Sequence, residues 1–309
     1  MSEGRPTTAG GVGGTEFDAI RRWVSLVPTD GAEVRLGPGD DVAVVDVAGP
    51  LAVSADALVE GTHFAPGADP ADVGWKALAA ALSDLAASRA RPLGAVVSLT
   101  ARRDDLGDWA DALMGGLGEC ARAFACPVLG GDTTRIDGPA VIAVTVLGAG
   151  EDVLVRSGAH PGELLQLSGD VGWAAAGLAG VAGARAHEAL HRPRPRLDLL
   201  AALAEATAGI DISDGFLADA AHLADASDVT LSIDAEAVVG PSLAAASSDA
   251  RRFALSGGED YELLVTAATP LPGFRVVGRV LPRGTHDLEW ADGTPVPREA
   301  RGWDHGAAP

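Results

Sequence analysis

Seven aspartates of this chain stand in apolar or glycine-rich segments, where an ionised carboxylate needs a partner. A single aspartate at a strand end or a helix start is explained by an Asx-turn or a helix cap. Several converging carboxylates are different, because two of them about 4 Å apart repel by roughly 4 kcal/mol at an effective dielectric near 20. The segments are LGPGDD, LAVSAD, AAALSD, VLGGD and IDISD, which contain Asp40, Asp41, Asp56, Asp84, Asp132, Asp211 and Asp214.

Such a cluster of carboxylates must be protonated or must bind cations. Magnesium takes oxygen ligands and prefers one or two carboxylates together with phosphate oxygens. We therefore predict a site in which several Mg²⁺ ions hold phosphate groups.

Asp84 is the aspartate that a local cap explains least. It lies inside a predicted helix, where aspartate is a poor residue. That face of the helix is expected to be packed, so the carboxylate needs a bonding partner. Its neighbours one turn away are Ala80, Ala81, Ala87 and Ser88.

Two glycine-rich segments accompany the aspartates and favour ligand binding. GGD at 130–132 and SGGED at 256–260 allow the backbone to approach a ligand closely, because glycine has no Cβ. The predicted helix after Asp214 is expected to offer free N–H groups to an anion. Each of these features alone is more often a simple turn.

The motifs that the chain lacks narrow the chemistry. There is no GxxxxGK[ST] loop, and the only lysine, Lys76, falls inside a predicted helix. This excludes a P-loop kinase, whose lysine reaches the β- and γ-phosphates. The HRD and DFG motifs of protein kinases, the GxSxG elbow and the HExxH motif are also missing from the sequence.

The elements that must position these residues alternate between helix and strand, which indicates an α/β fold. In the first half we predict helices over 16–26, 72–90 and 104–124, and strands over 41–47, 51–54, 93–99, 127–129 and 140–147. In the second half we predict strands over 163–167, 230–233, 262–266 and 274–280, and helices over 172–181, 197–207 and 216–226.

The division into domains follows from the same pattern. Residues 1–14 are predicted to be a disordered tail, 15–150 a first α/β domain, and 151–309 a second α/β domain. A chain of 309 residues with 47% hydrophobic content is long enough for two cores.

The bulk charge and the cysteines exclude other classes of protein. A net charge of −20 argues against binding to nucleic acid or to an anionic membrane surface. Cys120 and Cys126 make neither a disulfide framework nor a zinc pattern, and we expect both to be buried. No apolar run is long enough to span a bilayer, and residues 1–14 lack the plan of a signal peptide. A cytoplasmic protein is predicted.

Eight segments, in this order, form a longer pattern over nearly the whole chain: GDDVAVVD (39–46), SADALVEGTHF (54–64), ALSDLAAS (81–88), LGGDTTR (129–135), LSGDVG (167–172), DISDG (211–215), SGGEDYELL (256–264) and GWDH (302–305). The pattern resembles the thiamine-monophosphate kinase family. The second and seventh segments are long and specific. The resemblance implies ATP-dependent phosphorylation of thiamine monophosphate to thiamine diphosphate.

The resemblance also implies a fold and an assembly. The fold is the two-domain one shared with aminoimidazole ribonucleotide synthetase and selenophosphate synthetase. In it, the N-terminal domains of a homodimer form a shared β-barrel beside a C-terminal α/β domain, and ATP with several Mg²⁺ ions lies between the domains.

Family roles fall on matching positions of this sequence. The implied magnesium ligands are Asp40, Asp41, Ser54, the backbone of Ala55, Asp56, Asp84, Asp132, Asp211 and Asp214. The implied ATP contacts are Gly131, Asp132, Arg156 and Ser213, and the implied thiamine monophosphate contacts are His63, Glu259 and Trp303. Two positions depart from the family pattern: Ala55 replaces a threonine, and Trp303 stands where tyrosine is frequent.

The expected reaction is direct in-line transfer without a general base, because a phosphate monoester with a second pKa near 6 is largely ionised at neutral pH. The alternatives are another ATP-dependent enzyme of the same superfamily, a non-catalytic regulator that binds Mg-nucleotide, and a purely structural acidic protein. His63 has an alternative interpretation as a core histidine, and Arg156 as a surface residue.

Overall fold

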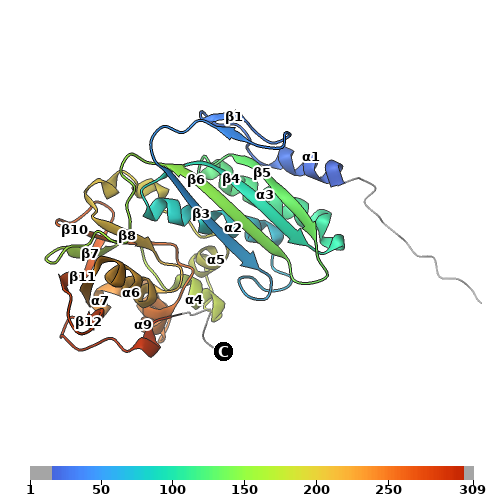
Figure 1. The fold of residues 1–309 in the computed structure, drawn as a ribbon. Helices are drawn as coiled ribbons and strands as arrows, with labels where there is room; N and C mark the ends of the chain where they lie inside the picture. The colour runs from blue at the N-terminus through green and yellow to red at the C-terminus, as the bar shows by residue number, and fades with distance from the viewer. Residues whose placement is uncertain (1–15, 303–309) are drawn as a thin grey trace, which may run out of the picture.

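Two open β-sheets, each packed against helices, organise the chain (Figure 1). The structure, a computed structural model, describes residues 16–302. The first sheet has the strand order β3-β6-β4-β5, and only β4 and β5 run parallel. Its strands are β3 (Leu51–Val59), β4 (Arg91–Ala101), β5 (Val128–Arg135) and β6 (Val141–Ala149).

One face of the first sheet is covered by α2 (Pro70–Ala87) and α3 (Asp108–Ala123). Strand β6 alternates as a half-buried strand should, with Ile142, Val144 and Val146 fully buried on that face. No helix of residues 16–302 crosses the other face, which is turned to the viewer in Figure 1. The remaining elements here are α1 (Glu16–Leu26), β1 (Val34–Leu36), β2 (Val44–Val45) and η1 (Arg103–Leu106).

Helix α2 is the central element of this half. It begins at a cap, because the Asp69 side chain accepts the Ala71 N–H at 2.9 Å, and Pro70 occupies the first helical position. It touches α3 backbone to backbone, since a Cβ on Gly74 would lie 1.9 Å from the Leu113 carbonyl oxygen. Small residues therefore hold α2 in a fixed position against its neighbours.

The second sheet is six-stranded, with the order β12-β9-β11-β7-β10-β8, and only β12 and β9 run parallel. Its strands are β7 (Leu164–Leu167), β8 (Ala208–Asp211), β9 (Val229–Ile233), β10 (Leu263–Ala267), β11 (Arg275–Pro282) and β12 (Leu288–Trp290). Its helices are α4 (Trp173–Leu178), α5 (Ala184–His191), α6 (Phe216–Ser227), α7 (Ala235–Val238), α8 (Pro241–Ala246) and α9 (Ala250–Ser256), with short η2 (Leu197–Leu199), η3 (Ala202–Glu205) and η4 (Arg298–Ala300).

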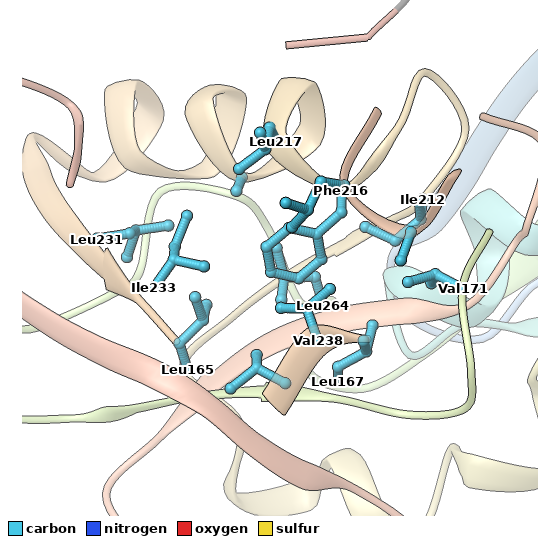
Figure 2. Close-up of a cluster of buried hydrophobic side chains, with 14 of the residues drawn as sticks. Leu165, Leu167, Val171, Ile212, Phe216, Leu217, Leu231, Ile233, Val238 and Leu264 are labelled. Atoms are coloured by element: carbon cyan, nitrogen blue, oxygen red, sulfur yellow. The ribbon is translucent and has the colours of Figure 1, made fainter. Parts of the chain in front are cut away.

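The core of the second half gathers around Phe216, the first residue of α6 (Figure 2). Its ring is fully buried and lies over the sheet among aliphatic side chains such as Leu264 and Leu167. Burial of one such side chain stabilises the fold by about 1.5–3 kcal/mol. The start of α6 is thus fixed by packing.

The two halves meet on α2. Ala86 and Ala87, at its end, pack against Leu203, Leu263 and Val265 of the second half. This contact brings the last turns of α2 against the strands β8 and β10.

The segment 191–196 of the second half also contacts the first half. Arg192 pairs with Asp72 at 2.5 Å and with Glu119 at 2.8 Å. The Trp75 indole N–H donates to the Pro193 carbonyl at 2.9 Å. The connection therefore lies along α2 and α3.

Several predicted elements differ from the structure. The predicted strand 51–54 continues to Val59, because β6 pairs with it as far as Val141. The predicted helix 197–207 is wrong, since this segment forms η2 and η3. Strand β8 was missed because all four of its residues are buried and it has no alternation to detect.

Other expectations have mixed outcomes. Both cysteines are buried as predicted, and burial raises the pKa of Cys126 to about 12. The predicted tail 1–14 lies outside the described residues. The boundary predicted at residue 150 falls between β6 and β7, and the division into domains stays a prediction. Among residues 16–302 no helix is long and apolar enough to cross a membrane.

Candidate active site

Strand β3 and helix α2 bring the first two aspartates together. Ser54 and Asp56 are on the helix-facing side of β3, because their partners on β6, Val146 and Val144, are fully buried. The Ser54 hydroxyl donates to the Asp84 carboxylate of α2 at 2.5 Å. Asp84 thus has the partner that its packed position required.

Asp211 and Asp214 add their charges from the second half. Burial, together with the carboxylates of Asp84 and Asp214, raises the pKa of Asp56 to about 6. Burial and the charge of Asp84 likewise raise the pKa of Asp211, which is only 4% exposed at the end of β8. Four of the seven predicted aspartates therefore lie within electrostatic range of one another.

Arg156 supplies the opposite charge at this place. Burial raises the pKa of Asp84, while the Ser54 hydrogen bond and the Arg156 guanidinium act in the other direction. Arg156 is exposed, and it follows the end of the first sheet in the connection to the second. The positive charge of Arg156 thus acts on the aspartate group.

The loop of residues 211–215 is fixed on both sides. Ile212 and Phe216 are fully buried in the core of the second half (Figure 2). Gly215 adopts a φ of +121°, which a glycine tolerates at this turn. Ser213, predicted to contact ATP, is left exposed between these anchors.

Asp219 of α6 is a site residue that the sequence analysis missed. Its buried carboxylate accepts the N–H groups of Ser213 at 3.0 Å, Asp214 at 3.2 Å and Gly215 at 3.1 Å. These three residues precede α6, so the expectation that the helix itself offers free N–H groups to an anion stays a prediction. The available signal was an acidic residue in the first turn of a predicted helix, which typically interacts with the helix start.

The glycine-rich segment 256–262 pairs with this loop. The Glu259 N–H donates to the Ser213 carbonyl and the Tyr261 N–H to the Ile212 carbonyl, both at 2.8 Å. Gly258 is required here, because a Cβ would lie 2.4 Å from the Ser213 carbonyl oxygen. Gly258 thus allows a close approach between two loops of the chain, and the approach to a ligand that was predicted for this segment stays a prediction.

Two residues of this segment have strained backbones. Glu259 has a φ of 64° and Tyr261 a φ of 53°, the left-handed region that costs a residue with a Cβ about 1 kcal/mol or more. Tyr261 is buried, and its pKa is raised well above the usual value by burial and by the charges of Glu259 and the nearby aspartates. The charges of Glu259 and of the aspartate group thus act on the same buried tyrosine.

Asp260 links the same segment to the start of α4. Its carboxylate accepts the Gly172 N–H at 2.6 Å and the Ala174 N–H at 3.3 Å, at the start of α4. Burial raises the pKa of Asp260 to about 7. Glu262 next to it pairs with Arg196 at 2.6 Å. This pair holds the end of the segment against the connection between the halves.

The predicted substrate contacts His63 and Glu259 lie on either side of Lys76. The Lys76 ammonium pairs with the Glu259 carboxylate at 2.7 Å and donates to the His63 carbonyl at 3.2 Å. His63 is half-buried, and its Nδ1 accepts the Val59 N–H at 3.1 Å. Trp303 lies outside the described residues.

Within one copy of the chain, Asp132 lies apart from the aspartate group at the junction of the halves. It is exposed on β5 and shares the uncovered face of the sheet with Ser98, whereas Asp56 lies on the helix-covered face of β3. Three strand spacings of about 4.8 Å separate the two strands, roughly 14 Å in all. Gly131 precedes Asp132 on the same outer strand.

Three further predicted ligands are exposed as well. Asp40 and Asp41 follow the turn at 37–39, where the Asp41 N–H donates to the Asp40 carboxylate at 2.8 Å. Ala55 lies on the uncovered face of β3, between Ser54 and Asp56. The structure thus divides the predicted ligands between the junction of the halves and the outer surface of the first half.

The donor set fits magnesium ions that share their coordination with a phosphate ligand. Among residues 16–302 no three His, Cys, Asp or Glu side chains lie close enough to hold one ion by themselves. Magnesium is usually bound by one or two carboxylates, with waters and substrate phosphates completing the octahedron. Burial, and after it the charges of Asp84 and Asp214, raise the pKa of Asp56, and a divalent cation at this place would stabilise the ionised carboxylate.

The family model described as AIR synthase related protein, N-terminal domain, matches residues 39–150. The thiamine-monophosphate kinase of Escherichia coli K12 is 37% identical over 331 aligned positions, which cover 95% of this chain and 99% of that protein.

Two solved structures are similar over most of the chain. The thiamine-monophosphate kinase of Stenotrophomonas maltophilia K279a is 34% identical with a TM-score of 0.79, covering 91% of this chain and 98% of that one. A structure described as AaThiL complexed with AMPPCP and TMP is 28% identical with a TM-score of 0.76, covering 94% and 95%.

Proposed function

Because this chain belongs to the thiamine-monophosphate kinase family, we infer that it transfers the terminal phosphoryl group of ATP to thiamine monophosphate. The product is thiamine diphosphate, and the enzyme is a phosphotransferase with a phosphate group as acceptor. The relative solved with AMPPCP, an ATP analogue, and TMP supports both ligands for this fold.

The observation that carries this function is the group of four aspartates at the junction of the halves. Asp56 and Asp84 come from the first half, and Asp211 and Asp214 from the second. ATP and thiamine monophosphate are both anions, so their approach requires positive charge between them. Bound Mg²⁺ supplies that charge and neutralises the phosphoryl group in transfer.

We propose that Asp56, Asp84, Asp211 and Asp214 hold the magnesium ions, with Asp40, Asp41, Asp132, Ser54 and the Ala55 backbone completing the set. The Ser54 hydroxyl, by donating to Asp84, fixes the direction in which that carboxylate points. Asp219, by accepting three backbone N–H groups, fixes the loop that carries Asp214. The ligands are thus oriented before any phosphate binds.

Transfer is proposed to be direct and in line, from ATP to the phosphate of thiamine monophosphate. The acceptor phosphate is largely ionised at neutral pH, with a second pKa near 6, so no side chain has to remove a proton. Arg156, whose positive charge acts on Asp84, is proposed to contact the ATP phosphates with Ser213 and Gly131. His63, Glu259 and Trp303 are proposed to contact the thiamine monophosphate.

A homodimer is proposed on the uncovered face of the first sheet. Val53 is 59% exposed, Leu51 47% and Val96 36%, which is unusual for aliphatic residues of one sheet face. A second copy that packs on this face would bury these side chains. The first sheets of the two copies would then close into a shared barrel. Asp132 is on the same face, so a dimer would place it at the interface.

The decisive assay is product formation from ATP, Mg²⁺ and thiamine monophosphate, followed by chromatography of thiamine diphosphate. Asp84→Asn is expected to fold and to lose at least a hundredfold in kcat, because a metal-binding charge disappears from the transferring groups. Free thiamine as acceptor is the control for specificity. A wild-type chain that binds Mg-ATP but forms no thiamine diphosphate would instead support the non-catalytic regulator. A cytoplasmic location remains a prediction from the sequence.

A further inference from the structure

The chain has 23 Lys and Arg residues, and all of them except Lys76 are arginines. The Lys76 side chain is buried. It projects from α2 toward the second half of the chain. There its ammonium pairs with the Glu259 carboxylate at 2.7 Å, and it also donates to the His63 carbonyl at 3.2 Å. One side chain therefore joins three segments: α2, the loop after β3, and the glycine-rich segment 256–262.

Stability alone is a weak reason for this contact. A buried ion pair is often replaced by apolar residues without loss, since the charges must be taken out of water. The surroundings on α2 are apolar, with Ala77, Ala79 and Ala80 all buried. An alanine-rich packed helix could accept a leucine or methionine at position 76 more easily than a charge.

The choice of lysine over arginine has a geometric reason. An ammonium is compact and donates in three directions, whereas a guanidinium is a wide planar fork. Only the compact group suits two acceptors, a carboxylate and a carbonyl, that come from different segments beside a tightly packed helix. The contact thus depends on the exact distances among the three segments.

Glu259 has a strained backbone conformation, and two contacts hold it, one through its backbone and one through its side chain. Its φ of 64° is in the left-handed region, and such residues persist only where the surroundings fix them. Its N–H donates to the Ser213 carbonyl at 2.8 Å, and its carboxylate pairs with Lys76. The backbone contact sets the loop, and the Lys76 contact sets the direction of the side chain.

We propose that Lys76 is a positioning residue for the acceptor substrate. Its ammonium fixes the Glu259 carboxylate and the His63 loop in the arrangement that receives thiamine monophosphate, and so sets the affinity for the acceptor rather than for ATP. The inference rests on the proposed function, because that function makes Glu259 and His63 substrate contacts.

The test is a double-mutant cycle on the KM of thiamine monophosphate, with its Kd measured by calorimetry. Lys76→Met is expected to raise KM at least tenfold, while the KM of ATP changes by less than twofold. If Lys76 acts through Glu259, adding Lys76→Met to Glu259→Gln raises KM by less than threefold more. The double variant leaves no unpaired buried charge, so it is expected to fold even where Lys76→Met alone does not.

Two further variants separate positioning from a general structural role. Arg192→Met breaks another contact between the halves and is expected to leave the KM of thiamine monophosphate within twofold. Lys76→Gln keeps N–H donors and is expected to recover part of the lost affinity. The proposal is overturned if Lys76→Met changes both KM values equally, or if its effect is the same in the Glu259→Gln background as in the wild type. A wild type without turnover overturns the proposed function instead.

Discussion

Replacing Asp56 by asparagine is expected to make the metal-free protein more stable and the enzyme inactive. Burial and the charges of Asp84 and Asp214 raise the pKa of Asp56 from 3.8 to about 6. The folded chain therefore holds this proton more tightly than the unfolded chain. Asp56 lowers the free energy of unfolding very little below its unfolded pKa. Its cost grows as the pH rises toward 6, and the free energy of unfolding stays reduced by a constant amount above that pH.

The size of the effect follows from the same values. One pKa unit corresponds to about 1.36 kcal/mol, so ionised Asp56 costs the folded state about 3 kcal/mol at pH 8. At pH 4.5 the cost is about 1 kcal/mol, because much of the carboxyl is protonated in the folded state. Asparagine carries no charge at either pH. Asp56→Asn should thus gain about 3 kcal/mol at pH 8 and about 1 kcal/mol at pH 4.5.

The assay is thermal unfolding in excess chelator at both pH values. For domains of this size, 1 kcal/mol corresponds to about 2 °C or more, so a rise in Tm of roughly 6 °C is expected at pH 8. Glu188→Gln is the control: this carboxylate of α5 in the second half is exposed, and the Tm of this variant should change by little. Adding Mg-ATP should stabilise the wild type more than Asp56→Asn.

One result would refute the reasoning behind this prediction. If Asp56→Asn is no more stable than the wild type at pH 8 without metal, neither burial nor the charges of Asp84 and Asp214 raise the pKa of Asp56 in the folded chain. The charge argument for a cation site at Asp56 would then fail. Equal gains at pH 8 and pH 4.5 would also contradict it, since only a titrating charge gives a pH-dependent difference.

Three other substitutions test the elements around the site. Asp219→Ala leaves three N–H groups without their acceptor and should destabilise the protein by about 3 kcal/mol in urea unfolding, whereas Asp219→Asn should lose less. Val53→Glu should convert a dimer to a monomer in light scattering, while Leu178→Glu, at a 76% exposed position of the other half, should not. Arg196→Met leaves the half-buried Glu262 carboxylate with the Ser168 hydroxyl but without its cation, and should cost about 3 kcal/mol; adding Glu262→Gln should restore most of this stability.

The residue types and their order in the sequence determined the chemistry of this protein. Acidic residues in apolar and glycine-rich segments, together with the missing P-loop, indicated cation-assisted phosphate chemistry. Helix boundaries were predicted well where the signal was local: α1 spans Glu16–Leu26 as expected, and α6 begins at Phe216. Such periodicity and capping depend on neighbours within a few turns.

Only the tertiary structure decided which of these residues meet. Asp84 and Asp211 are more than a hundred positions apart in the chain, and their proximity depends on the packing of α2 against the second sheet. Asp132, identical in type, lies on the opposite face of its sheet because strand pairing fixes the register. Lys76 meets Glu259 for the same reason. A sequence records which side chains are available, but long-range packing sets the distances on which charge interactions depend.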